Sequence, residues 1–291
     1  MKLPPFEYAC PTKLSEAVAL LAARNGDAKL IAGGQSLVPM LAFRLAAPAL
    51  LVDLRKLPEL RRIEISANGV VLGSMVRWRD ILADTRLRTA HPLLLAAVTH
   101  VAHYQIRNRG TIGGSIAHAD PAAEVPGIAL TCEADVATVG TAGPRVIKAA
   151  DFFVGPLMTV LEPDEIIVEI RFPAWPAPRR WGFQEFARRR GDFAMAAAAV
   201  WYDQDDGGKA RNAHVGVIGV GDRPQRLPQA EAVLNGRIID DATIAQAEAA
   251  AAAAVDPQTD IHASADYRRA LTGTMVERAL LSAGKLIPIQ D

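Results

Sequence analysis

Apolar and polar positions alternate in short blocks along the first third of the chain. Residues 12–26 place apolar side chains on one helical face, with Thr12 as a candidate N-terminal cap, so we predict a helix there. Short apolar runs predict strands at 29–32 and 50–54, and one or two helical turns at 38–45. This order predicts strands that are separated by short helices.

The middle and the end of the chain mix both periodicities. Before the proline-rich segment Pro173–Pro178, helices are predicted at 78–83, 92–104 and 122–130, and strands at 70–72, 134–139, 145–148 and 166–172. That segment holds three prolines in six residues and indicates a linker. Beyond it we expect strands at 195–202 and 213–220, a hairpin turn at 205–208, and helices at 241–254 and 266–283. The chain is therefore predicted to be α+β.

Two glycine pairs stand out against this background. One lies in Ala32-Gly33-Gly34-Gln35-Ser36-Leu37, after a predicted strand, and the other lies in Gly110-Thr111-Ile112-Gly113-Gly114-Ser115. Without Cβ atoms a backbone can approach a ligand, and successive N–H groups can surround an anion. Either pair alone is more often a structural turn. Together they favour two loops that hold the diphosphate of a dinucleotide.

Composition and charge exclude several other classes of protein. The 291 residues contain 32 Lys plus Arg and 32 Asp plus Glu, so no net charge attracts nucleic acid. Cys10 and Cys132 are the only cysteines, too few for an iron–sulfur cluster or a disulfide framework. No apolar run has the length of a membrane span or a signal peptide. We therefore expect a cytoplasmic protein without an integral membrane segment.

Catalytic and metal motifs are weak. The Gly216–Gly221 segment has its glycines spaced the wrong way round for the nicotinamide fingerprint. His100 and His103 share one face of the predicted helix 92–104, but no third ligand has a suitable spacing, so no metal site is predicted. No catalytic residue is predicted on this chain. A chain that binds a cofactor without acid–base machinery is typical of redox work.

Three motifs resemble one family. Ala32–Pro39 resembles its A-G-G-x-S-L-x-P loop, and Thr111–Ala122 resembles its T-I-G-G loop followed by A-x-A-x-P-A. Gly191-Asp192-Phe193-Ala194 resembles the G-D-[YF]-A that opens its C-terminal domain. Their order and spacing match the FAD-binding medium subunit of molybdenum hydroxylases, typified by carbon monoxide dehydrogenase and the flavin domain of xanthine dehydrogenase.

The resemblance implies a fold and its division. We expect the two-subdomain FAD-binding fold of the vanillyl-alcohol oxidase type, with subdomains at 1–55 and 56–175. A C-terminal flavoprotein domain, a small antiparallel sheet with a helix bundle, is expected at 179–291.

The resemblance also implies which residues contact FAD. The diphosphate would lie between the two glycine motifs, Asp120 and Glu124 would meet the ribose or ribityl side, and Phe193 would lie near the isoalloxazine. The full implied set is Ala32, Gly33, Gly34, Gln35, Ser36, Leu37, Ala102, Thr111, Gly113, Gly114, Ser115, Ala117, Asp120, Glu124, Ile166, Ile167 and Phe193.

Some positions depart from the family pattern. Ser115 stands where Asn or Asp is common, and Glu185 stands where we expect Lys. The segment from Pro121 to Asp135 has only Cys132 and lacks the cysteine-bearing loop of the aromatic acyl-CoA reductases.

The implied function is electron transfer. Such a subunit passes electrons from the [2Fe-2S] clusters of a small subunit through FAD to an external acceptor. Molybdopterin would lie on a large subunit, in a dimer of heterotrimers. The alternative is a self-contained flavin-dependent oxidase of the same fold. The substrate and the acceptor are not encoded in these motifs.

Overall fold

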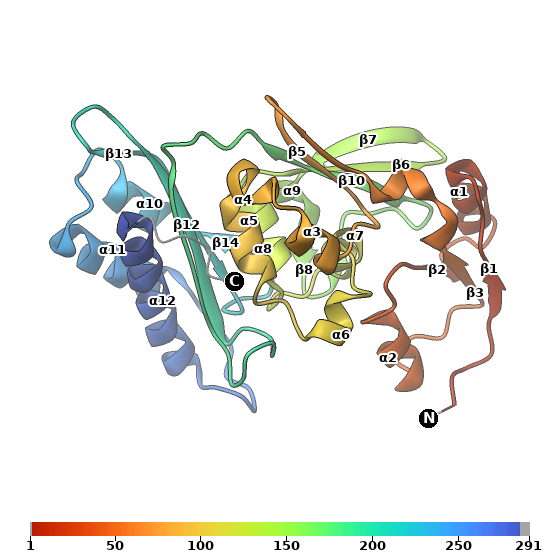
Figure 1. The fold of residues 1–291 in the computed structure, drawn as a ribbon. Helices are drawn as coiled ribbons and strands as arrows, with labels where there is room; N and C mark the ends of the chain where they lie inside the picture. The colour runs from red at the N-terminus through yellow and green to blue at the C-terminus, as the bar shows by residue number, and fades with distance from the viewer. Residues whose placement is uncertain (1, 286–291) are drawn as a thin grey trace.

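The computed structural model describes residues 2–285. Position 1 of the first expected subdomain and positions 286–291 of the expected C-terminal domain lie outside the described residues. Three main sheets follow one another along the chain (Figure 1). The α+β class predicted from the sequence is confirmed.

The first unit is a small parallel sheet with two helices. Its strand order is β1-β3-β2, and all its strand pairs are parallel. Its elements are β1 (Glu7–Ala9), α1 (Leu14–Ala22), β2 (Ala28–Ile31), α2 (Leu37–Ala42) and β3 (Leu50–Asp53). The helix α1 buries Ala17, Val18 and Leu21, which agrees with the predicted face. Thr12 does not cap it: Lys13 is the N-cap, and its side chain makes no cap hydrogen bond.

The second unit is an antiparallel sheet packed against several short helices. The strand order is β4-β5-β10-β6-β7. The sheet consists of β4 (Ile63–Ser66), β5 (Gly69–Gly73), β6 (Asp135–Gly140), β7 (Gly143–Lys148) and β10 (Ile166–Pro173). The short 3₁₀ segments η1 (Leu54–Lys56) and η2 (Pro58–Arg61) connect this unit to the first.

Six short helices lie between β5 and β6 along the chain. They are α3 (Trp78–Ala83), α4 (Leu87–Ala90), α5 (Pro92–Val98), α6 (Tyr104–Arg107), α7 (Ile112–His118) and α8 (Glu124–Thr131). The predicted helix at 92–104 was wrong, because α5 ends at Val98 and α6 begins at Tyr104. Between them Ala102 adopts a left-handed φ of 45°, which no helix tolerates. Beyond β7 lie α9 (Ala149–Phe152), β8 (Phe153–Gly155) and β9 (Met158–Thr159).

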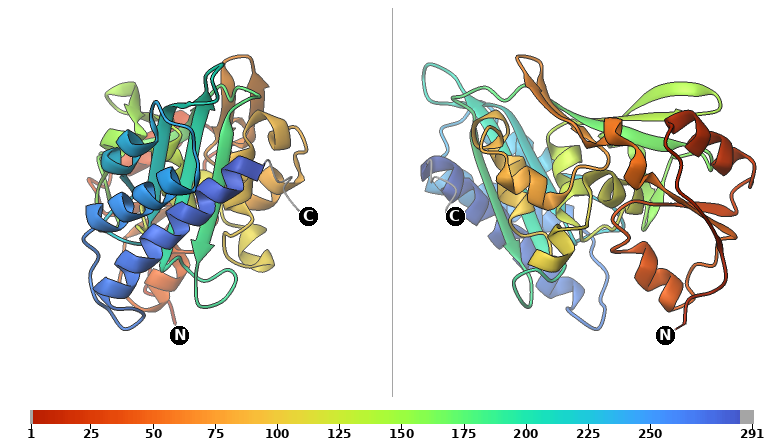
Figure 2. Two further views of the ribbon diagram at one scale, coloured as in Figure 1. Left: turned by 90° about the vertical axis from the view of Figure 1, so that its left-hand side faces the viewer. Right: turned by 45° about the vertical axis from the view of Figure 1, so that its right-hand side comes forward.

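The third unit is a four-stranded antiparallel sheet that is covered by three helices on one face. Its order is β11-β12-β13-β14. The strands are β11 (Arg180–Phe186), β12 (Ala196–Gln204), β13 (Ala210–Ile218) and β14 (Gln225–Arg226). The helices are α10 (Pro228–Leu234), α11 (Asp241–Ala254) and α12 (Ala265–Lys285). Figure 2 shows α12 lying across the sheet, with the short helices of the second unit on its other face.

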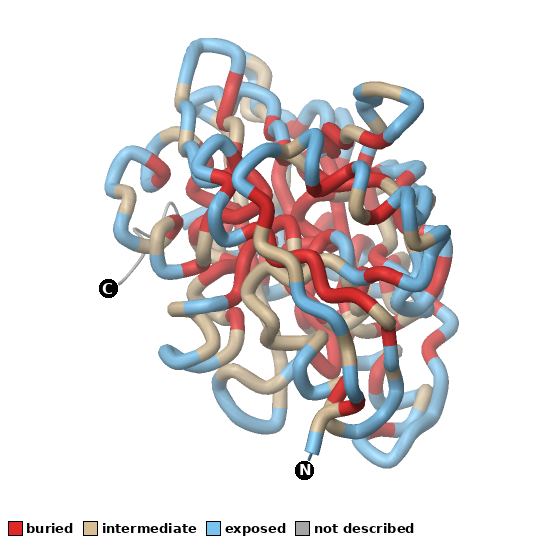
Figure 3. The backbone as a smooth tube through the Cα atoms, turned by 90° about the vertical axis from the view of Figure 1, so that its right-hand side faces the viewer, coloured by how far each residue is buried: buried red, intermediate tan, exposed pale blue. Residues whose placement is uncertain are grey.

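The central strand β12 joins two hydrophobic cores. Ala196, Ala198 and Val200 belong to the core shared with the C-terminal helices, whereas Ala197 and Ala199 belong to the core of the second unit. Because successive side chains of a strand point to opposite faces, β12 is buried on both sides. In Figure 3, which colours the backbone by burial, the buried residues in red run through the middle of the molecule. Of the described residues, no helix is long and apolar enough to cross a membrane.

Candidate FAD-binding site

The first glycine motif follows the carboxyl end of β2 and leads into α2. Gly34 has a φ of +73°, a left-handed conformation that favours glycine. Gly33 is needed for a different reason: a Cβ there would lie 2.3 Å from the carbonyl oxygen of Arg109. The side-chain amide of Gln35 donates to the Gly33 carbonyl at 3.0 Å and helps to hold the turn. The two glycines thus set the turn and its close approach to a second segment.

The second glycine motif is the first turn of the helix α7, not the loop that we expected. Thr111 is the N-cap, and its Oγ1 accepts from the Gly114 amide at 3.1 Å. A Cβ on Gly113 would lie 2.7 Å from the backbone oxygen of Ser74, so glycine lets α7 pack directly on that chain segment. The sequence suggested a loop because glycine pairs are uncommon inside helices. Tertiary packing and the Thr111 cap override that preference here.

The structure brings the two motifs together. Gly33 contacts Arg109 and Gly110, and the Arg109 Nε donates to the Gly33 carbonyl at 3.5 Å. Thr111 also pairs with Arg77 in an isolated antiparallel bridge. The sequence separation between the motifs is therefore closed by direct backbone contact.

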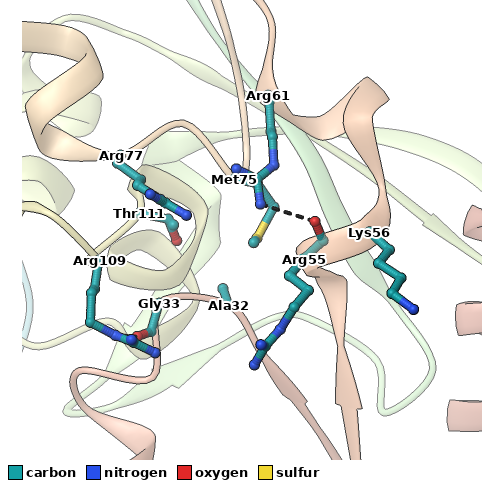
Figure 4. Close-up of a pocket in the computed structure, with 9 residues that line it drawn as sticks. All are labelled: Ala32, Gly33, Arg55, Lys56, Arg61, Met75, Arg77, Arg109 and Thr111. Carbon is teal, nitrogen blue, oxygen red and sulfur yellow. Dashed lines mark hydrogen bonds between the residues drawn. The ribbon is translucent and has the colours of Figure 1, made fainter. Parts of the chain in front are cut away.

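A pocket of about 350 Å³ opens where they meet (Figure 4). It is lined by Ala32, Gly33, Arg55, Lys56, Arg61, Met75, Arg77, Arg109 and Thr111. Its volume lies toward the small end of the range of ligand sites, enough for part of a dinucleotide. Three of its residues belong to the predicted glycine motifs, and five carry positive charge.

The basic residues of this pocket were missed by the sequence reasoning. Arg61, Arg77 and Arg109 are scattered along the chain, and nothing in their spacing announces that they meet. Arg55 and Lys56 did carry a signal, because they come two and three residues after β3, which runs parallel to β2. Ligands bind at the carboxyl ends of parallel strands, and these two ends lie side by side.

Arg55 is held by a carboxylate at the end of β3. Its guanidinium lies 2.6 Å from Asp53, which also accepts from the Tyr8 hydroxyl at 2.8 Å. Burial of Asp53 raises the pKa of its carboxyl, but the hydrogen bonds from Arg55 and Tyr8 outweigh this, and the pKa lies below its ordinary value. Asp53 therefore stays charged and fixes Arg55 at the edge of the pocket.

A second group of predicted residues gathers around the segment before β12. Gly191 packs so closely that a Cβ would lie 2.7 Å from the Ala102 backbone oxygen. The Ala194 amide donates to Ala122 at 3.4 Å, beside the turn in which Asp120 accepts from the Ala122 amide at 2.9 Å. Phe193 lies between these contacts along the chain and is 61% exposed. Ala102, Asp120 and Phe193 thus lie on segments that touch one another.

Two acidic side chains near this group are buried. Burial, together with the nearby charges of Glu185 and Asp120, raises the pKa of Glu124 to about 8. The Glu185 side chain is 3% exposed, and its Oε2 has no hydrogen-bond partner. Its other oxygen lies 3.8 Å from His100. Glu124 is therefore neutral around pH 7. The neighbouring acid, Glu185, has one carboxylate oxygen without a hydrogen-bond partner.

The remaining predicted residues have different surroundings. Ile166 and Ile167 are buried in β10 and pack into two separate cores, so neither side chain lines the pocket. Ser115 is half-buried and Ala117 is exposed on α7. Contact of these residues with FAD remains a prediction.

The expected pairing of His100 and His103 on one helix was wrong. His100 follows α5, and His103 is the N-cap of α6. Within the described part of the chain, no group of three or more His, Cys, Asp or Glu could hold a metal ion.

The residues present fit the phosphate part of FAD. The pocket places cationic side chains beside backbone that glycines leave bare, which suits the two negative charges of a diphosphate. The exposed ring of Phe193 is free to meet an aromatic ring system.

Comparison with known proteins agrees with this geometry. Residues 4–175 match the family model of the FAD binding domain in molybdopterin dehydrogenase, and residues 181–283 match the CO dehydrogenase flavoprotein C-terminal domain. The chain belongs to this family of FAD-binding subunits of molybdopterin dehydrogenases.

Curated relatives match over almost their whole length. The nicotine 6-hydroxylase medium subunit of Paenarthrobacter nicotinovorans is 41% identical, with 98% of this chain and 99% of the relative covered. The carbon monoxide dehydrogenase medium chain of Hydrogenophaga pseudoflava is 38% identical, with 96% and 97% covered.

Solved structures agree equally well. The carbon monoxide dehydrogenase of Hydrogenophaga pseudoflava superimposes with a TM-score of 0.95 at 40% identity, covering 98% of this chain and 99% of that chain. Quinoline 2-oxidoreductase of Pseudomonas putida 86 gives 0.93 at 40% identity, with the same coverage. The expected family is confirmed.

Proposed function

We propose that this chain is the FAD-binding electron-transfer subunit of a molybdenum-containing hydroxylase. The observation that carries the proposal is the direct contact between the two glycine motifs at one cationic pocket. Bound FAD supplies the redox chemistry, because flavin exchanges electrons singly or in pairs. The subunit would stand between the [2Fe-2S] clusters of a small subunit and an external acceptor.

The residues of this chain bind and orient the cofactor. Backbone amides of Gly33–Leu37 and of Thr111–Ser115 would hold the diphosphate, with Asp120 and Glu124 toward the ribose or ribityl side. Phe193 would cover the isoalloxazine and keep water from one of its faces. Glu185 leaves no Lys at a position where we expect one, so any positive charge near the flavin would have to come from elsewhere.

Partners follow from the relatives' names. Both relatives above are called medium subunits or chains, which supports a molybdenum-binding large subunit and a [2Fe-2S] small subunit as partners. We propose a dimer of such heterotrimers in the cytoplasm. We also propose the divisions 1–55, 56–175 and 179–291 as the two FAD-binding subdomains and the C-terminal domain.

The first test is a cofactor titration. The full chain, freed of flavin by mild chaotrope, is titrated separately with FAD, FMN and riboflavin while flavin fluorescence is recorded. The proposal predicts one FAD per chain and much weaker binding of riboflavin, which lacks phosphate. Acid precipitation should release all colour, because no covalent anchor is expected. A protein that binds none of these flavins would contradict the proposal.

The rival is a self-contained flavin oxidase. It would bind FAD equally well, so spectra alone do not separate it from an electron-transfer subunit. Rapid reduction of the flavin by a small organic substrate, in a preparation shown to contain this chain alone, would favour the oxidase.

A further inference from the structure

We propose that Glu124 and Glu185 together hold one proton in the folded chain and exchange it with solvent through His100. The two acids come from different parts of the fold, since Glu124 begins α8 and Glu185 lies in β11. His100 lies in the segment between α5 and α6. The inference deepens the proposed function, on which it rests only where the proton is coupled to bound FAD.

The two carboxyl groups are buried, and His100 connects Glu185 to the surface. Glu124 is 5% exposed, and the side chain of Glu185 is 3% exposed. The Nδ1 atom of His100 lies 3.8 Å from Glu185 Oε1, and its ring packs edge-on against Phe183, with 5.1 Å between the ring centroids. The His100 side chain itself is 37% exposed. An imidazole in this position can exchange protons with water at one nitrogen and with the carboxyl at the other.

Neither carboxyl is neutralised by a basic side chain. In the part of the chain that the structure describes, no Lys or Arg forms an ion pair with Glu124 or Glu185, and Glu185 Oε2 has no hydrogen-bond partner. The Lys that we expect at position 185 would place a positive charge beside Glu124. This chain places a second acid there instead.

The other elements around α8 supply no balancing charge. Asp120, in the turn before α8, adds a further negative charge that acts on Glu124. His118 ends α7 and forms no ion pair within residues 2–285. His214 of β13 and Arg226 of β14 pair with other carboxylates. The helix α12 packs on the opposite face of β11.

Two buried acids without a cation favour a state with one proton. Both carboxyl groups do not ionise readily, because burial and the like charge each disfavour the second negative charge. Burial is the larger effect on Glu124, and the Glu185 and Asp120 charges add to it, so that its pKa is raised to about 8. One proton therefore remains at pH 7. Because interacting acids titrate as a unit, it belongs to the pair.

The pair lies next to segments that would meet the flavin. Glu124 follows the turn in which the Ala122 oxygen accepts from the Ala194 amide, and Ala194 follows the exposed Phe193. A ring system that takes up two electrons and one proton gains one negative charge. That charge favours the protonated pair, so the pair should keep its proton to a higher pH when bound FAD is reduced.

The test follows the infrared carbonyl band of a protonated carboxyl in the full flavin-free chain as the pH is raised from 5 to 9. We expect a band that is lost near pH 8 and is missing from Glu124→Gln. Glu185→Gln should move its loss to lower pH, because a like charge is removed. Glu185→Lys should abolish the band at pH 7, because an ammonium group stabilises the carboxylate. Glu59→Gln, at an exposed position, is the control, and circular dichroism verifies that each variant is folded.

A second measurement tests the route to solvent. After transfer of the protein to D₂O, the band shifts as deuterium replaces the proton. His100→Leu keeps an apolar side chain against Phe183, so the band should remain while its shift slows by about 100-fold, the lower end of what a positioned proton-transferring group contributes. Exchange at the wild-type rate would overturn the role of His100.

A third measurement tests the coupling to FAD. The chain is loaded with FAD and reduced with dithionite, and the band should then persist to a higher pH than in the oxidised protein. An unchanged pH of loss would overturn the coupling.

The inference and the proposed function fail in different ways. A chain that binds FAD but shows no protonated carboxyl at pH 7, or whose Glu185→Gln variant loses the band at the wild-type pH, would overturn the inference and leave the proposed function intact. A chain that shows the band and its shifts but binds no FAD would contradict the proposed function alone.

Discussion

At the scale of single residues, Gly33 shows how tightly the two motifs are packed. A Cβ at this position would lie 2.3 Å from the Arg109 carbonyl oxygen and 2.9 Å from the Gly110 Cα. Both neighbours are backbone, so no side-chain rotation relieves the overlap. The contact between the motifs therefore depends on the absence of one methyl group.

Gly33→Ala should separate the two motifs. We expect a loss of about 1–3 kcal/mol of stability, typical of overpacking, together with a clear loss of FAD affinity. Urea unfolding and flavin titration measure the two effects. Gly284→Ala serves as control, because a Cβ there meets nothing within 4 Å. Wild-type FAD affinity in a stable Gly33→Ala protein would show that the contact does not shape the site.

Glu124 makes stability depend on pH. Its pKa is raised from 4.5 to about 8 by burial and by the Glu185 and Asp120 charges, so the folded chain holds a proton that the unfolded chain releases. Stability should then fall as pH rises from about 4.5 to about 8 and level off above it. Glu124→Gln should remove this loss. The free energy of unfolding of the variant should therefore rise relative to that of the wild type by on the order of 1 kcal/mol for each pH unit within that window.

Unfolding in urea at pH 5, 6, 7 and 8 measures this difference. Glu59→Gln, at an exposed position, is the control. A Glu124→Gln stability curve parallel to that of the wild type would contradict the raised pKa.

At the scale of elements, the helix α7 carries the second motif. Thr111→Ala removes the N-cap oxygen and should cost about 1 kcal/mol of stability. Thr111→Ser retains the hydroxyl and should retain most of that stability. Thermal unfolding compares the two variants. Equal losses in both would mean that the methyl group of Thr111, not its cap, stabilises α7.

Elements with strong local signals could be predicted from the sequence. The helices at 78–83 and 241–254 have the predicted bounds, and the hairpin joining β12 and β13 turns at the predicted Asp–Gly segment. The strand β11 was missed because Arg180–Phe186 mixes charged and aromatic residues. Its pairing with β12, and a Gly182 that lets α12 approach, stabilise it instead.

Only part of the candidate site could be predicted from the sequence. Both glycine motifs could be found because missing side chains leave a local signature. The arginines at 61, 77 and 109 could not, since they meet only after the first two sheets pack together. The break at Ala102 carried no Gly or Pro signal, so the left-handed turn beside Gly191 also escaped prediction.

At the scale of the whole molecule, β12 connects the FAD-binding part to the C-terminal part. Its two faces belong to two different cores, so the third sheet cannot move freely against the helices of the second unit. Phe193 lies three residues before this strand, and Glu185 lies in its neighbour β11. The C-terminal unit thus holds the proposed flavin end of the site in a fixed position relative to α8.

The central claim is that this chain carries FAD within a molybdenum hydroxylase. The most direct measurement is to purify the tagged chain gently from its native host and to determine FAD, molybdenum and iron per chain. The account predicts one FAD per chain, together with molybdenum and iron that are carried by a large and a small partner subunit. A chain that purifies alone, without molybdenum or iron, and whose flavin is rapidly reduced by a small organic substrate would contradict it.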